Sequence, residues 1–313
     1  APSASATVTS KLPPAIATQQ DKMRQVVERL GLPERLLRFA DAAEAGERCG
    51  WPLALGGWWF SESGWVQPPS LCAANLAANP ERIHTHFGCA IARIEHDDAG
   101  WNVYDRSGSL TARSPVLILA AGIGLAAFAP AATVPVVSAR GQVSLFDAPA
   151  GSAPHVVVCR MGYVSPAIDG WRCAGASFDV DDHDTGLRQS DHLDNLAKLE
   201  AMLPGYTAAI DPTRLGGRVG FRPASPDRLP MIGAVPLTGP VSAATPLAAI
   251  ARQPGLYVLS GFGARGLVWS ALAGELLAAQ IVGDPLPVER DLRDALDPAR
   301  YLLRPPTRTS GDE

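Results

Sequence analysis

Apolar residues follow two different patterns along this chain, and each pattern predicts a different kind of sheet. Two short continuous apolar runs, 116–120 and 256–260, are typical of strands buried on both faces of a parallel sheet. The apolar segment 267–282 predicts a long helix, and its small residues would allow close packing on that sheet. These segments predict one α/β layer built from distant parts of the chain.

Elsewhere apolar and polar residues alternate, as they do in antiparallel sheets with one exposed face. Short alternating runs occupy 82–113 and 134–178, and turn residues such as Asp97-Asp98-Ala99-Gly100 separate them. A helix is predicted over 190–203. Near the start, helical patterns over 21–48 are interrupted at Gly31 and Pro33 and restart over 34–43.

The predicted parallel strands flank the antiparallel block, so the pattern predicts two interleaved domains in a mixed α/β fold. One domain, built on an antiparallel sheet, is expected from 21–70 and 125–215. The other, which contains the parallel strands, is expected from 71–124 and 216–290. The ends, 1–20 and 291–313, are expected to be a loose segment and a tail.

Composition and net charge limit the classes of protein to which this chain can belong. The chain has 313 residues, of which 47% are hydrophobic and 19% charged, as expected for a globular chain with a sizeable core. Its net charge of −4 argues against nucleic-acid binding through the overall field, so a local patch or another domain would have to bind RNA.

The number and spacing of the cysteines indicate the cellular compartment of the protein. The five cysteines are scattered without a Cys-x-x-Cys pair, which favours reduced thiols in a cytoplasmic protein over disulfides or a metal site. No run of about 18 uncharged apolar residues, the length a membrane-spanning helix needs, is present.

The segment with the clearest chemistry is Leu256–Leu267, where a strand meets a glycine-rich turn and then the start of a helix. Gly261, Gly263 and Gly266 would let the backbone approach a ligand closely. The helix start would offer unpaired N–H groups and a positive dipole end. The pattern predicts a site for an anion or a reduced cofactor, although a plain helix-entry turn would have the same residues.

Further candidates are weak when taken singly. Arg222 stands before a proline turn in Gly220-Phe221-Arg222-Pro223, where a fixed guanidinium could bind a carboxylate with two hydrogen bonds. A surface ion pair is the commoner fate of an arginine. Tyr163 could equally be an ordinary sheet tyrosine, and Arg140-Gly141-Gln142 could be a bulge.

As an ordered set, these motifs resemble the D-amino-acid-oxidase-like family of FAD-dependent amine oxidoreductases. Within it, the resemblance is closest to a branch that modifies tRNA and carries a second, methyltransferase half that uses S-adenosylmethionine. The matching segments are Gly64-Trp65, Gly141-Gln142-Val143-Ser144, Gly162-Tyr163, Gly175-Ala176-Ser177, Asp227-Arg228-Leu229-Pro230-Met231-Ile232-Gly233 and Gly263-Ala264-Arg265-Gly266-Leu267. They cover the chain from about residue 20 onward.

The resemblance implies oxidation of a carboxymethylaminomethyl group on a wobble uridine or 2-thiouridine of tRNA, with release of glyoxylate. Arg222 matches the residue that binds the substrate carboxylate, Tyr163 matches an active-site tyrosine near it, and Arg265 lies by the substrate and flavin. The expected cofactor-binding residues are Gly64, Gly122, Gly141, Gln142, Gly233, Gly261, Gly263, Ala264, Arg265, Gly266 and Leu267. No metal site is expected.

One family feature is predicted to be missing. Members of the family open with a strand, a Gly-x-Gly-x-x-Gly turn and a helix, followed by an acidic residue that binds ribose. The nearest candidate considered, Gly122-Ile123-Gly124, has no third glycine at the right spacing and lies in mid-chain. The resemblance therefore implies that the domain over 71–124 and 216–290 is a Rossmann-like FAD-binding domain without its first βαβ unit. It implies that the domain over 21–70 and 125–215 is an antiparallel-sheet substrate domain. An oxidase of a free glycine-like amine and an inactive fragment stay open as alternatives.

Overall fold

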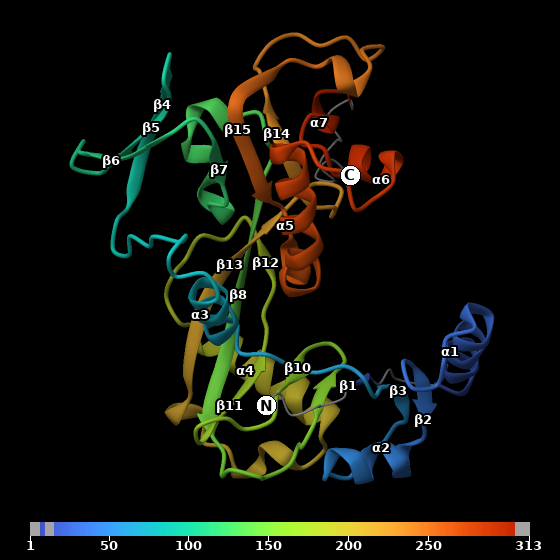
Figure 1. Cartoon of the computed structure of the whole chain (residues 1–313). Coiled ribbons are helices and arrows are strands. Elements are labelled where there is room, and N and C mark those ends of the chain that lie inside the picture. Colours follow the sequence, from blue (N-terminus) through green and yellow to red (C-terminus); the bar gives the residue numbers. More distant parts are fainter. Residues whose placement is uncertain (1–6, 10–15, 304–313) are drawn as a thin grey trace, which may run out of the picture. The chain divides into compact units, whose positions relative to one another are not determined.

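A computed structural model of the chain describes residues 7–9 and 16–303, and Figure 1 shows their helices and strands. The chain divides into two compact units. Unit 1 takes its described residues from Ala1–Pro80, Arg140–Asp179 and Asp184–Gly220, and unit 2 from Glu81–Ala139, Val180–His183 and Phe221–Glu313. Because each unit combines three separate stretches of chain, the predicted interleaving is confirmed.

Unit 1 is built on a mixed sheet whose strands follow the order β12-β8-β11-β10-β9-β1-β3-β2, with β13 paired to β8. Most neighbours are antiparallel, but β1 runs parallel to β9. The strands are β1 (Thr7–Thr9), β2 (Arg38–Ala40), β3 (Gly57–Phe60), β8 (Val137–Asp147), β9 (Val157–Cys159), β10 (Tyr163–Val164), β11 (Trp171–Gly175), β12 (Asp179–Val180) and β13 (Gly216–Ala224).

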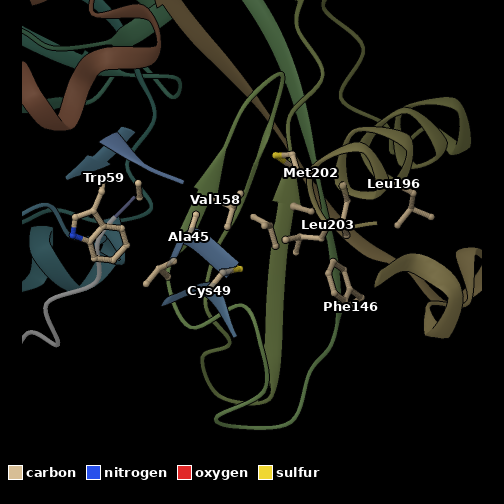
Figure 2. Packing of buried hydrophobic residues seen from close by; sticks show 13 residues of the cluster. Ala45, Cys49, Trp59, Phe146, Val158, Leu196, Met202 and Leu203 are labelled. Atoms are coloured by element: carbon tan, nitrogen blue, oxygen red, sulfur yellow. The ribbon is translucent and has the colours of Figure 1, made fainter. Parts of the chain in front are cut away.

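Helix α4 (Gln189–Met202) packs against β11 and covers one face of this sheet. Leu196, Leu199 and Met202 bring its apolar side into a buried cluster with side chains from the strands, such as Phe146 and Val158 (Figure 2). The short helix α2 (Ala42–Cys49) contributes Ala45 and Cys49 to the same cluster. Helices α1 (Ile16–Leu30) and α3 (Pro68–Ala77) complete the helices of this unit among the described residues.

Unit 2 contains the predicted parallel strands. β15 (Arg252–Ser260) runs parallel to β7 (Leu117–Leu119) and antiparallel to β14 (Met231–Pro236), with Leu256 opposite Leu117. Helix α5 (Gly266–Val282) packs on β14, as Figure 1 shows. Its other strands and α-helices among the described residues are the antiparallel strands β4 (Ile91–Asp97), β5 (Gly100–Asp105) and β6 (Leu110–Ser114) and the helices α6 (Arg290–Leu296) and α7 (Arg300–Leu303).

Several local predictions were wrong. Residues 34–43 were expected to form a helix, but β2 lies there, and α2 begins only at Ala42, where the Asp41 side chain accepts a hydrogen bond from the Glu44 N–H at 2.9 Å. This N-cap fixes the start of the helix more strongly than the apolar periodicity does. The predicted strand over 83–87 is mostly loop.

The chain ends also differ from expectation. Of the segment 1–20, residues 7–9 pair with β3 and β9 and residues 16–20 begin α1; the rest lies outside the described residues. The expected tail over 291–313 includes α6 and α7, while 304–313 also lie outside them. Residues 125–139 belong to unit 2. Which unit binds cofactor and which binds substrate stays a prediction.

The described residues include no helix with the length and apolar character that a membrane span requires. The same part of the chain contains no group of three or more histidine, cysteine or acidic side chains placed to bind a metal ion. All five cysteines are free thiols.

Candidate functional site

Two glycine-containing turns lie at the same edge of the unit 2 sheet. Because β7 and β15 are parallel neighbours, their carboxyl ends meet at one edge. Gly122 follows β7 and Gly261 follows β15, and the Ser260 hydroxyl lies 3.5 Å from the Gly122 carbonyl oxygen that accepts its hydrogen bond. The carboxyl edge of parallel strands is where open α/β sheets bind ligands.

Positive φ angles make glycine necessary in these turns. Gly122 (φ 58°), Gly261 (φ 77°) and Gly263 (φ 55°) all adopt the left-handed conformation. Gly261 is packed tightly, since an added Cβ would lie 3.0 Å from the Met231 Cε atom and 3.3 Å from Ser225 Cβ. At Gly122 and Gly263 an added Cβ would meet nothing within 4 Å, so a ligand could approach the backbone there.

The turn after β15 leads directly into α5, a helix of 17 residues. A single 3₁₀ turn, η6 (Gly263–Arg265), precedes it. No side chain caps the first N–H groups of α5. Because these donors have no partner within the helix, they can bind an electron-rich ligand atom, and the helix dipole favours the same charge.

The spacing of this turn corrects the prediction that the chain has no Gly-x-Gly-x-x-Gly. Gly261, Gly263 and Gly266 have that spacing, and they stand between a strand and a helix. The rest of the dinucleotide fingerprint does not follow. About 20 residues further on, where an acidic residue would end the next strand, Glu289 precedes the short helix α6 instead. The residue spacing alone is the signal that identifies this turn.

The predicted substrate arginine lies on β13, where Arg222 is half-buried. The segment after it turns at Ser225–Leu229, with Arg228 in a left-handed conformation (φ 63°), and continues into β14. Gly233 (φ 140°) lies within β14, where an added Cβ would approach Gln280 Oε1 at 3.0 Å. Gly233 thus allows α5 to pack closely on β14.

Tyr163 lies in unit 1, on β10. Its neighbour Val164 is part of the core under α4, so alternation places Tyr163 on the opposite face of the sheet. The Tyr163 hydroxyl is 3.7 Å from the Cys173 Sγ atom. Burial raises the pKa of the Cys173 thiol, and the contact with Tyr163 partly offsets this. Gly64 is exposed in the loop between β3 and α3.

Gln142 has a structural role in this fold. Its side chain is 0% exposed, and its amide binds the backbone of Arg188 in both directions, at 2.8 Å each. The preceding Gly141 is also buried in β8, and Arg140 forms a buried ion pair with Asp191. This network joins β8 to α4 and leaves the Gln142 side chain no exposed atom to offer a cofactor.

Sequence reasoning also missed a pair of residues in the predicted tail. Arg300 and Tyr301 both form hydrogen bonds with Asp227, in the segment that carries the Asp-x-x-Pro motif. Arg300 lies 73 residues from Asp227. No local pattern connects residues at such a separation, so the sequence offered no signal for this pair.

The family of FAD dependent oxidoreductases (DAO) matches residues 6–280. The bifunctional tRNA 5-methylaminomethyl-2-thiouridine biosynthesis protein MnmC of Azoarcus sp. is 63% identical over 297 residues, which are 95% of this chain and 47% of that protein. Its counterpart from Aromatoleum aromaticum is 59% identical over 286 residues, with 91% and 45% covered. The chain thus spans about half the length of these relatives.

Solved structures share the fold at much lower identity. Iminodiacetate oxidase from Chelativorans sp. BNC1 is 24% identical with a TM-score of 0.70, over 91% of this chain and 73% of the other. Glycine oxidase from Geobacillus kaustophilus is 19% identical with a TM-score of 0.71, over 94% and 74%. At this identity the two structures establish the architecture alone.

Proposed function

We propose, because this chain belongs to the family of FAD dependent oxidoreductases, that it is the oxidising part of an enzyme that modifies the wobble uridine of tRNA. The observation that carries this proposal is the 63% identity, over 95% of the chain, to a tRNA 5-methylaminomethyl-2-thiouridine biosynthesis protein. In that bifunctional relative the chain matches less than half of the length, so a methyltransferase half and tRNA binding belong to the proposal as well.

The proposed substrate is a uridine or 2-thiouridine that bears a carboxymethylaminomethyl group. When bound, FAD would accept a hydride from the carbon that joins the secondary amine nitrogen to the carboxylate. The lone pair of that nitrogen then forms the C=N bond of an imine. Water adds to that carbon, and the C–N bond breaks to release glyoxylate. The base retains an aminomethyl group, with its nitrogen now a primary amine.

The described residues fit the ring end of FAD. Gly122 and Gly263 leave open space beside the backbone, where a flat ring could approach. The uncapped first turn of α5 would stabilise negative charge at the ring, because its N–H groups point outward and its dipole is positive there. Gly233, Ala264 and Leu267 would shape the surroundings of this turn. A cofactor contact of the exposed Gly64 stays a prediction, and the backbone of Gly141 is buried in β8.

The substrate roles are proposed for two residues. Arg222 would bind the carboxylate of the substrate through its guanidinium. An active-site role of Tyr163 stays a prediction. Arg265, exposed at the start of α5, would lie beside the substrate and the ring. No protein group needs to remove a proton if the amine binds neutral, so positioning is the main contribution of these side chains.

Among the described residues of unit 2, we find no comparable site for the pyrophosphate end of FAD. The strand β7 has no described neighbour on its second edge, and its Ile118 side chain is 45% exposed. On α5, which is apolar on most sides, Val268 is 83% exposed. A helix with apolar residues all around is normally buried. We propose that a further strand and helix of the complete enzyme cover these residues and bind the pyrophosphate.

The test uses the intact protein with FAD and two kinds of substrate. We expect glyoxylate release from tRNA that carries the carboxymethylaminomethyl group, and no turnover of free glycine or sarcosine. Oxidation of the free amines with modified tRNA left unchanged would support a small-molecule oxidase instead. A protein that stays colourless after incubation with FAD would be an inactive fragment.

The Arg222→Ala variant tests the carboxylate contact. Loss of one partner of a charge-assisted pair typically costs about 2–5 kcal/mol, so we expect kcat/KM on modified tRNA to fall by at least about 30-fold. Flavin absorbance should be unchanged. Arg218→Ala, four residues earlier on the same strand, is the matched control. Wild-type kinetics in the Arg222→Ala protein would exclude the assigned role.

A further inference from the structure

A buried arginine in the last described helix forms hydrogen bonds with the turn that follows Arg222. Arg300 on α7 is 4% exposed. Its guanidinium donates to both carboxylate oxygens of Asp227, at 2.8 and 3.0 Å, and to the Leu229 carbonyl oxygen at 2.9 Å. Three charge-assisted bonds from one planar group fix both the carboxylate and the backbone of the turn.

Further donors converge on the same carboxylate. Oxygen Oδ1 of Asp227 accepts hydrogen bonds from the Tyr301 hydroxyl at 2.5 Å, the Leu229 N–H at 3.1 Å and the Ser225 hydroxyl at 3.2 Å. Burial by itself would raise the pKa of Asp227, but the bonds from Arg300 and Tyr301 outweigh it and keep the pKa well below its usual range. Asp227 is therefore ionised at neutral pH, at the centre of the turn.

The turn that Arg300 binds, Ser225–Leu229, contacts the glycine-rich turn after β15. Ala224 pairs with Phe262 in an isolated antiparallel bridge. Gly261 has room for a hydrogen only, because Ser225 and Met231 lie against it. On the far side, the Arg265 guanidinium donates to the Arg228 carbonyl oxygen. The segment Ser225–Leu229 therefore braces the glycine turn at both ends.

Helix α7 is itself anchored to the sheet. Asp297, which precedes it, binds the Arg252 guanidinium through both carboxylate oxygens, at 2.7 and 2.9 Å. Arg252 lies on β15 and also donates to the Ala234 carbonyl oxygen on β14 at 3.1 Å. A continuous set of polar contacts thus runs from the strands through α7 to Asp227 and the glycine turn.

We propose that Arg300 and Tyr301 are positioning residues that act through Asp227 to hold the backbone of Gly261–Gly266 in the conformation that receives the flavin ring. The part of this inference that concerns flavin rests on the proposed function. The bracing of the turn rests on the contacts alone. A braced turn presents its N–H groups without first having to become ordered, which favours binding.

The experiment measures the turn and the cofactor separately. In the flavin-free intact protein, hydrogen–deuterium exchange of peptides over 261–267 should be at least about tenfold faster in Arg300→Gln than in wild type. Peptides from the unit 1 core, 143–147 and 196–203, should not change. The FAD dissociation constant should rise at least about fivefold. Arg290→Gln, an exposed arginine on α6, is the control, since its side chain is 80% exposed.

Graded variants separate bracing from a general loss of stability. Arg300→Lys keeps the charge but not the two-pronged geometry, and Tyr301→Phe removes one donor, so both should fall between wild type and Arg300→Gln. Unchanged exchange over 261–267, or equal acceleration throughout the chain, would overturn the bracing. If exchange accelerates locally but wild-type protein binds no FAD, the bracing stands and the proposed function fails. Local acceleration with an unchanged FAD affinity would overturn the positioning of the cofactor.

Discussion

The two turns at the carboxyl edge of the unit 2 sheet begin alike and end differently. Each follows an apolar parallel strand, and each contains a left-handed glycine, Gly122 or Gly261. After β7 the chain forms two short 3₁₀ helices, η1 (Gly122–Ala127) and η2 (Ala129–Ala131), whereas after β15 it forms the 17-residue helix α5. Pro130 lies in η2 and has no N–H with which η1 could be continued as a longer helix.

The two turns also differ in the residues that pack against them. In η1, Leu125 is buried in an apolar cluster with residues such as Val258 and Met231. The turn after β15 is instead braced by the ionic cluster around Asp227. A strand followed by a left-handed glycine therefore makes a turn, but a candidate ligand site also needs the uncapped long helix and the support behind it.

The largest expected effect distinguishes the two turns by packing. Gly261→Val combines a left-handed backbone that a β-branched residue resists with contacts at 3.0 and 3.3 Å that leave no room. We expect a loss of about 2–5 kcal/mol in the free energy of unfolding, measured by urea denaturation of the flavin-free protein. A loss below about 1 kcal/mol would show that Met231 and Ser225 yield easily.

An intermediate effect tests the backbone conformation without crowding. Gly122→Ala meets open space but must keep a positive φ, so it should cost about 1–2 kcal/mol. Gly124→Ala, two residues away in equally open space without a positive φ, is the matched control and should stay within about 0.5 kcal/mol of wild type. Equal stabilities for the two variants, in the same denaturation assay, would contradict the strain argument.

The smallest effect concerns pH. The pKa of Asp227 is lowered on folding, so its stabilising contribution is present above the unfolded value of about 3.9 and declines as the pH falls below it. The difference in unfolding free energy between wild type and Asp227→Asn should therefore be constant from pH 7 to 5 and shrink below about pH 4. Urea denaturation across this range measures it. A difference that already changes near pH 6 would indicate another titrating group.

Much of the fold could be predicted from the sequence. Local periodicity predicts the parallel pair β7–β15, the helix α4 and the three-stranded sheet β4–β6. An element buried on one face has apolar residues at regular intervals, and a strand buried on both faces is a continuous apolar run. The helix predicted over 34–43 failed because the capping side chain of Asp41 decides where the helix begins, and periodicity does not register a cap.

The glycine spacing at 261–266, the apolar strands on either side of the antiparallel block and the ordered motifs that mark the family are all present in the residue order. They are local or sequential features, so they need no knowledge of the fold. The buried network around Gln142, and the contact of Arg300 with Asp227 from 73 residues away, arise only when the chain folds. Such contacts depend on how distant segments fold together, and sequence spacing carries no record of that.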